Sequence, residues 1–89
     1  MTEADAVTLQ PFARPRFDGV RGHWMINAPE RVIVLDEIGK AIVDQLTGQT
    51  LGEAIDALAT AYDAPREAIA ADVLSFVSEL NAKGLLRHG

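Results

Sequence analysis

The sequence contains no cysteine, and its five aromatic residues include a single tryptophan and a single tyrosine. Without cysteine there can be no disulfide framework, thiolate zinc site, iron–sulfur cluster or thiol nucleophile. No uncharged apolar run reaches the roughly 20 residues that a membrane span needs. The first ten residues are acidic and lack the basic and long apolar segments of a secretory signal. Stability is therefore expected from packing alone, and a cytoplasmic location is the default.

The chain length and the placement of charge suggest one small soluble domain. A chain of 89 residues supports one core and buries only about 60 to 65% of its unfolded surface. Residues 36–89 hold nine acids against four bases, and this half accounts for the net charge of −5. We expect residues 1–12 to form a flexible N-terminal arm and residues 13–89 to form a single domain.

The period of the apolar residues changes near Asp36, which predicts strands before this residue and helices after it. Three short strands are expected over residues 14–17, 23–27 and 31–35, separated by turns at residues 18–22 and at Ala28-Pro29-Glu30. In the second strand, alternation places Trp24 and Ile26 on one face and Met25 on the other, with His23 and Asn27.

Three helices are expected in the second half of the chain. Asp36 can cap the first helix, and Gly48 suits the left-handed residue that would end it. Thr50 and Glu53 fit a capping box for the second helix. The third follows Pro65, carries an apolar stripe and stops before Leu85 and Leu86, which are expected to fold back onto the core. This order predicts a winged-helix-like α+β fold of three antiparallel strands followed by three helices.

Convergent reactive groups are not visible, so the sequence gives no reason to expect an enzyme, a cofactor or a metal site. His23 and His88 are isolated, and Ser75 and Ser78 have no neighbouring base. Asp72 and Glu79 share a helix face at a spacing that could hold a cation, but a solvated polar face is several times more common. The same acidic helices oppose a winged-helix DNA-binding function, because they would repel phosphates.

Residues Val32–Leu35 are four consecutive large aliphatics, which leave open which face is buried. If Val32 and Val34 face the helices, Ile33 and Leu35 lie on a face that either awaits a partner or is covered by the N-terminal arm. On the last helix, Leu74 lies on a flank beside Ala70 and Val77, next to the main stripe. A strand edge beside such a flank forms a groove that can bind an extended peptide by strand addition.

Two segments resemble the PqqD family of pyrroloquinoline quinone biosynthesis. One is Pro29-Glu30 followed by an aliphatic strand, Leu35, a capping residue and a helix. The other has the family's C-terminal spacing, in Ile69, Asp72-Val73, Phe76, Leu80 and Gly84. The resemblance runs from about residue 14 to residue 86. The chain differs in having Asp36 where the family often has Asn, and Asn27-Ala28 where an apolar residue often precedes Pro-Glu.

The resemblance implies a non-catalytic peptide chaperone that binds the precursor peptide PqqA and presents it to the radical SAM enzyme PqqE. Related domains bind leader peptides along the third strand beside the last helix, so a leader-recognition domain of another modified-peptide pathway is the alternative. Carried onto this sequence, the peptide-binding residues are Arg31, Val32, Ile33, Val34, Leu35, Ala70, Val73, Leu74 and Val77. Phe76 and Leu80 are assigned to the core. Possible partner contacts are Arg16, Trp24 and Met25, and a homodimer through strand exchange is a further possibility.

Overall fold

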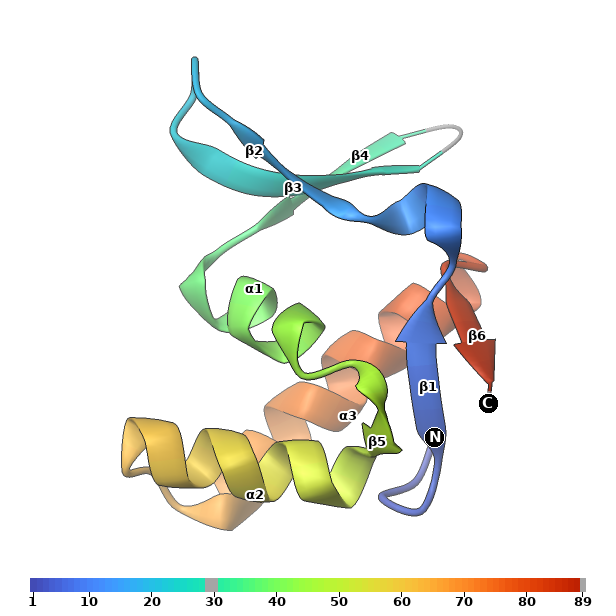
Figure 1. Cartoon of the computed structure of the whole chain (residues 1–89). Coiled ribbons are helices and arrows are strands. Elements are labelled where there is room, and N and C mark those ends of the chain that lie inside the picture. Colours follow the sequence, from blue (N-terminus) through green and yellow to red (C-terminus); the bar gives the residue numbers. More distant parts are fainter. Residues whose placement is uncertain (29–30, 89) are drawn as a thin grey trace.

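The computed structural model, shown in Figure 1, describes residues 1–28 and 31–88. For Arg31 it describes only the backbone. The predicted Pro29-Glu30 turn lies outside the described residues. The elements follow in the order β1 (Ala6–Leu9), a 3-10 turn (Pro11–Ala13), β2 (Pro15–Asp18), β3 (His23–Ala28), β4 (Arg31–Leu35), α1 (Glu37–Asp44), β5 (Thr47–Thr50), α2 (Leu51–Tyr62), α3 (Arg66–Ala82) and β6 (Leu86–His88).

The three predicted strands form one antiparallel sheet in the order β2-β3-β4. Trp24 lies opposite Leu35, and Ile26 lies opposite Ile33, so these four side chains share one face. Ile26 is fully buried, which agrees with the face predicted from alternation. Figure 1 shows this sheet at one end of the molecule, with α1 next to it and α2 at the opposite end.

The orientation of β4 is the reverse of the one considered from the sequence. Val32 and Val34 are 53% and 60% exposed, whereas Leu35 is 3% exposed and Ile33 packs against the core. The reason is the register with β3, which places Leu35 and Ile33 on the same side as the buried Ile26. Neither β1 nor any other described strand pairs with β4 on its second edge, so no strand of the described residues closes this edge of the sheet.

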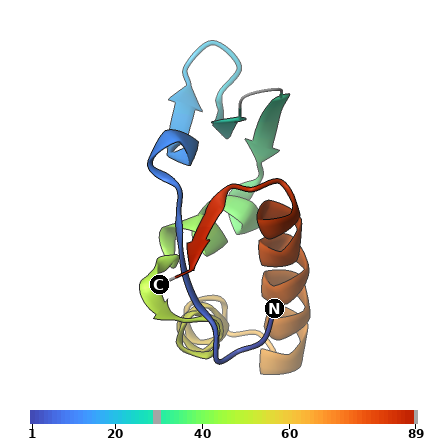
Figure 2. The same cartoon turned by 90° about the vertical axis from the view of Figure 1, so that its right-hand side faces the viewer.

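A second antiparallel sheet, in the order β5-β1-β6, was not predicted. Its central strand is β1, so residues 6–9 of the expected flexible arm are an ordered strand with Val7 1% exposed. Figures 1 and 2 show β1 running beside β6. The sequence signal was weak because β5 reads Thr-Gly-Gln-Thr and β6 has three residues, and because their pairing with β1 joins distant parts of the chain.

The helix boundaries agree with most of the predicted caps. The Asp36 carboxylate accepts a hydrogen bond from the Gly39 amide at 2.7 Å, and the capping box of Thr50 and Glu53 is complete. Gly48 does not end α1, which stops at Asp44. Instead, Gly48 lies within β5 at φ 95°.

A single apolar core joins both sheets and the three helices, and it contains no buried polar or charged side chain among the described residues. As predicted, the chain folds back after α3, because Leu85 and Leu86 are buried. The largest side chains with less than 2% exposure are Val7, Ile26, Leu51, Ile55, Val73, Val77, Leu80 and Leu85. None of the helices in the described part of the chain has the length and hydropathy that crossing a membrane requires.

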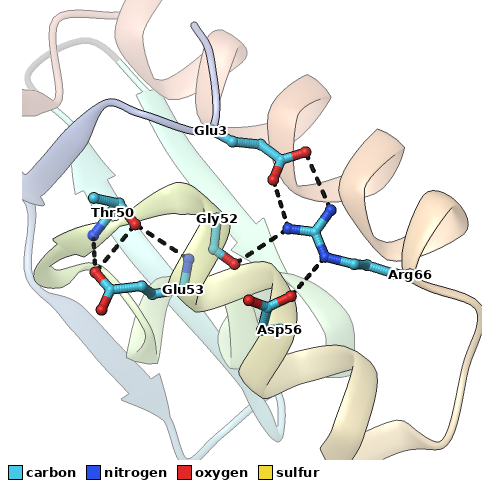
Figure 3. A network of polar contacts seen from close by, with 6 residues as sticks. All are labelled: Glu3, Thr50, Gly52, Glu53, Asp56 and Arg66. Atoms are coloured by element: carbon cyan, nitrogen blue, oxygen red, sulfur yellow. Dashed lines mark hydrogen bonds and ion pairs between the residues drawn. The ribbon is translucent and has the colours of Figure 1, made fainter.

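An ion-pair network attaches the N-terminal segment to α2 and α3, as Figure 3 shows. The Arg66 guanidinium donates to both carboxylate oxygens of Glu3 and to Asp56. The Gly52 amide donates to the Glu3 carbonyl at 2.9 Å, and a Cβ at Gly52 would lie 3.2–3.4 Å from Glu3. Glycine at this position therefore permits the close approach that fixes the start of the chain.

The order of the N-terminal strand can be tested with two valines of opposite burial. Val7→Ala should lower the free energy of unfolding by about 2 kcal/mol, because it removes two buried methyl groups. Val20→Ala, at a position that is 97% exposed, should change it by less than about 0.5 kcal/mol. Urea denaturation of both variants measures the difference, and equal effects would contradict the packing of β1.

The Glu3–Arg66 pair predicts a pH dependence of stability. The hydrogen bond from Arg66 lowers the pKa of Glu3 below the ordinary value of a glutamate. The stabilisation is therefore present above the unfolded-state pKa and is lost as the pH falls through the folded-state pKa. Glu3→Gln should reduce the loss of thermal stability between neutral and acidic pH. In an Arg66→Gln background the same substitution should have no further effect, and an unchanged pH profile in both backgrounds would refute this linkage.

Candidate peptide-binding cleft

A cleft of about 480 Å³ lies where the end of β4, the start of α1 and one flank of α3 meet. Its lining combines aliphatic, aromatic and acidic side chains. The residues are Val34, Leu35, Asp36, Ile38, Gly39, Ile42, Asp72, Ser75, Phe76 and Glu79. Two of the predicted strand residues, Val34 and Leu35, are among them.

The β4 strand forms the border of its sheet, with β3 on one side. Alternate amides and carbonyls of a border strand point away from the sheet and are available to another extended chain. Since Val34 and Leu35 belong both to this border and to the cleft lining, the strand edge and the cleft are continuous. An extended peptide that paired with β4 would therefore have the cleft beside it.

The α3 residues chosen from the sequence do not line this cleft. Val73 and Val77 have 0% exposure and belong to the core, and Ala70 and Leu74 are partly buried against it. Leu74 and Phe76 lie about 160° apart around the helix. The cleft is therefore on the flank opposite to the one that the apolar pattern suggested.

The flank that faces the cleft carries Asp72, Ser75, Phe76 and Glu79, at spacings of three, four and seven residues. The sequence predicts that Asp72 and Glu79 share a solvated helix face, and both residues are exposed where they line the cleft. The sequence predicts Phe76 in the core. The side chain packs against the core and also lines the cleft. Leu80 is 1% exposed, as predicted.

The beginning of α1 closes one side of the cleft through a tight first turn. The Asp36 carboxylate holds the Gly39 amide at 2.7 Å. A Cβ at Gly39 would lie 3.1 Å from Asp36 Oδ1, 3.6 Å from Leu35 and 3.7 Å from Phe76. The glycine therefore leaves room for the Asp36 cap, whereas the distances to Leu35 and Phe76 are ordinary van der Waals contacts.

The possible partner contacts lie on two different faces of the sheet. Trp24 is 37% exposed, packs edge-on against Phe17 at 5.4 Å between ring centroids, and has Lys40 Nζ 4.1 Å from its ring centroid. Arg16 and Met25 lie opposite each other on the other face. A second hollow, of about 440 Å³, adjoins Trp24 and Lys40. One flat surface of a partner cannot contact all three predicted residues.

Comparison with known proteins agrees with the sequence resemblance. Residues 23–86 match the family described as coenzyme PQQ synthesis protein D (PqqD). The chain belongs to the PqqD family. A protein named PqqA binding protein from Gluconobacter oxydans is 42% identical over 94 residues, covering 97% of this chain and 98% of that protein. Another of the same name, from Bradyrhizobium diazoefficiens, is 39% identical over 87 residues, covering 97% and 84%.

Two solved structures of this family share the mixed α+β fold. The solution structure of the PqqD part of Methylobacterium extorquens PqqCD has a TM-score of 0.81 and 32% identity, covering 97% of this chain and 93% of that one. It is described as a functional, stand-alone recognition element for ribosomally synthesised and modified peptides. The crystal structure of PqqD from Xanthomonas campestris has a TM-score of 0.62 and 34% identity, with 90% of each chain covered.

The cap that positions α1 beside the cleft gives a stability prediction. Asp36→Ala should lower the free energy of unfolding by about 1 kcal/mol, because the Gly39 amide loses its acceptor. Asp36→Asn should retain most of the stability, since an asparagine oxygen caps equally well. Urea denaturation distinguishes the two variants. Equal losses in both would show that the carboxylate charge, rather than the cap hydrogen bond, carries the stabilisation.

Proposed function

We propose that this protein is a non-catalytic peptide chaperone of pyrroloquinoline quinone biosynthesis, which binds the precursor peptide PqqA by strand addition to β4. The observation that carries the proposal is the free border of β4 beside the cleft. The names of the relatives and the description of the Methylobacterium structure support the same function. In this proposal the protein acts in the cytoplasm, where it presents the bound peptide to the radical SAM enzyme PqqE.

Strand addition gives the peptide two different surroundings. Side chains alternate across a strand, so one set from the peptide would lie on the inner side of the sheet, with Ile33 and Leu35, and enter the cleft. The other set would lie on the outer side, beside the exposed Val32 and Val34. Backbone pairing with residues 31–35 would supply affinity, and the side chains that enter the cleft would supply selectivity.

Two related functions use the same border strand. A precursor from another modified-peptide pathway would bind in the same way, so titration with several candidate precursors separates this alternative from PqqA. A second copy of the chain could exchange or pair strands at β4 and would then compete with the peptide. Sedimentation with and without PqqA identifies such a homodimer, because bound peptide should shift it to monomer.

Binding is tested by adding PqqA to isotope-labelled protein and recording amide shifts. The largest changes should occur in β4 and in the α3 residues that face the cleft, because strand addition pairs with β4 and covers the flank of Phe76. The partly buried flank of Ala70 and Leu74 provides an internal control and should shift least. Adding PqqE to the complex should broaden the signals of bound PqqA if the chaperone presents it.

Two outcomes would contradict the proposal. Spectra that do not change at millimolar PqqA would exclude binding of PqqA. Shifts confined to Ala70 and Leu74 would exclude the β4 cleft and would support the groove predicted from the sequence pattern.

A further inference from the structure

The cleft has an apolar floor and an acidic mouth. Leu35 and Ile42 are each 3% exposed, and Phe76 adds a partly buried ring between α3 and α1. Around them stand the exposed carboxylates of Asp36, Asp72 and Glu79, and no lining residue carries a positive charge. A ligand that fits this lining needs an apolar part next to a cationic part.

The acids of the cleft mouth do not take part in the ion pairs found among the described residues. Those pairs join Arg21 to Asp18, Lys40 to Asp44, and Arg66 to Glu3 and Asp56. These pairs engage three of the bases at other places on the molecule, and no cation of the cleft lining compensates the field of its three carboxylates.

We propose that the cleft selects a lysine or arginine side chain of the bound peptide, an inference that rests on the proposed function. Such a side chain has a long aliphatic stem that packs on apolar surface while its charged head stays at the water boundary. The stem would lie on Leu35 and Phe76, and the head would reach the row of acceptors formed by Asp72, Ser75 and Glu79. These three residues follow one face of α3 at spacings of three and four.

The position of the cleft relative to β4 strengthens this assignment. A peptide residue whose side chain points inward beside Leu35 is directed into the cleft by the geometry of strand addition. An inorganic cation is a poorer occupant, because the described residues contain no group of three His, Asp or Glu side chains arranged to hold a metal ion. An acidic peptide residue at this position would meet like charge. The cleft therefore favours a basic residue embedded in an apolar stretch.

The test replaces each lysine and arginine of PqqA in turn by norleucine, which keeps the aliphatic stem and removes the charge. Dissociation constants are measured by calorimetry against the wild-type protein and against the Asp72→Asn/Glu79→Gln double variant. One replacement should weaken binding to the wild-type protein by about fivefold at low salt, and the effect should shrink at high salt. The double variant should bind that peptide and unmodified PqqA equally well.

Glu67→Gln is the matched control, because Glu67 is an exposed acid on α3 outside the cleft lining, and it should retain the wild-type preference. If every norleucine peptide binds the wild-type protein as tightly as PqqA does, with the β4 amide shifts intact, the charge selection is refuted and the proposed function stands. A preference that persists in the double variant also refutes it. If no peptide binds, the proposed function fails and the inference fails with it.

Discussion

The pairing of β3 with β4 is the constraint on which the rest of the molecule depends. Its register places Ile33 opposite Ile26 and Leu35 opposite Trp24, so the inner side of the sheet closes over the helices. A slip of one residue would turn Ile33 and Leu35 to solvent and bring Val32 and Val34 inward. The same register leaves the second edge of β4 at the border of the sheet, next to the cleft. Core formation and the candidate binding edge thus follow from one set of strand contacts.

The sequence was a good guide where the signal is local. Caps at Asp36 and Thr50, the alternation in β3 and the amphipathic stripe of α3 each depend on neighbours within a few residues, and the structure agrees with them. The second sheet could not be found in this way, since β1 pairs with strands about 40 and 80 residues further along the chain. A four-residue polar strand such as β5 has no periodicity of its own to reveal such pairing.

The candidate site was only partly predictable for a similar reason. A helical stripe has two flanks, and the apolar content of Leu74 and Ala70 made one of them look like the binding wall. The position of β4 relative to α3 decides which flank of α3 lines the cleft. This position depends on packing through Leu35 and Ile42, which lie outside α3. The aliphatic run of β4 was ambiguous because four large apolar residues show no alternation. Only the register with β3 separates its inner and outer sides.

The distribution of charge also bears on how an open strand edge remains free. An exposed border strand with valines at alternate positions is a template for pairing with a second copy of itself. In an antiparallel pair of two β4 edges, the end of β4 that lines the cleft in one copy lies beside the opposite end of β4 in the other copy, so the two clefts do not meet. Each copy nevertheless carries a net charge of −5, and the repulsion between two whole molecules of like charge disfavours self-association. A peptide with a basic residue is instead attracted to the acidic cleft at the same edge. Charge thus favours a foreign strand with a basic residue over a second copy of the chain.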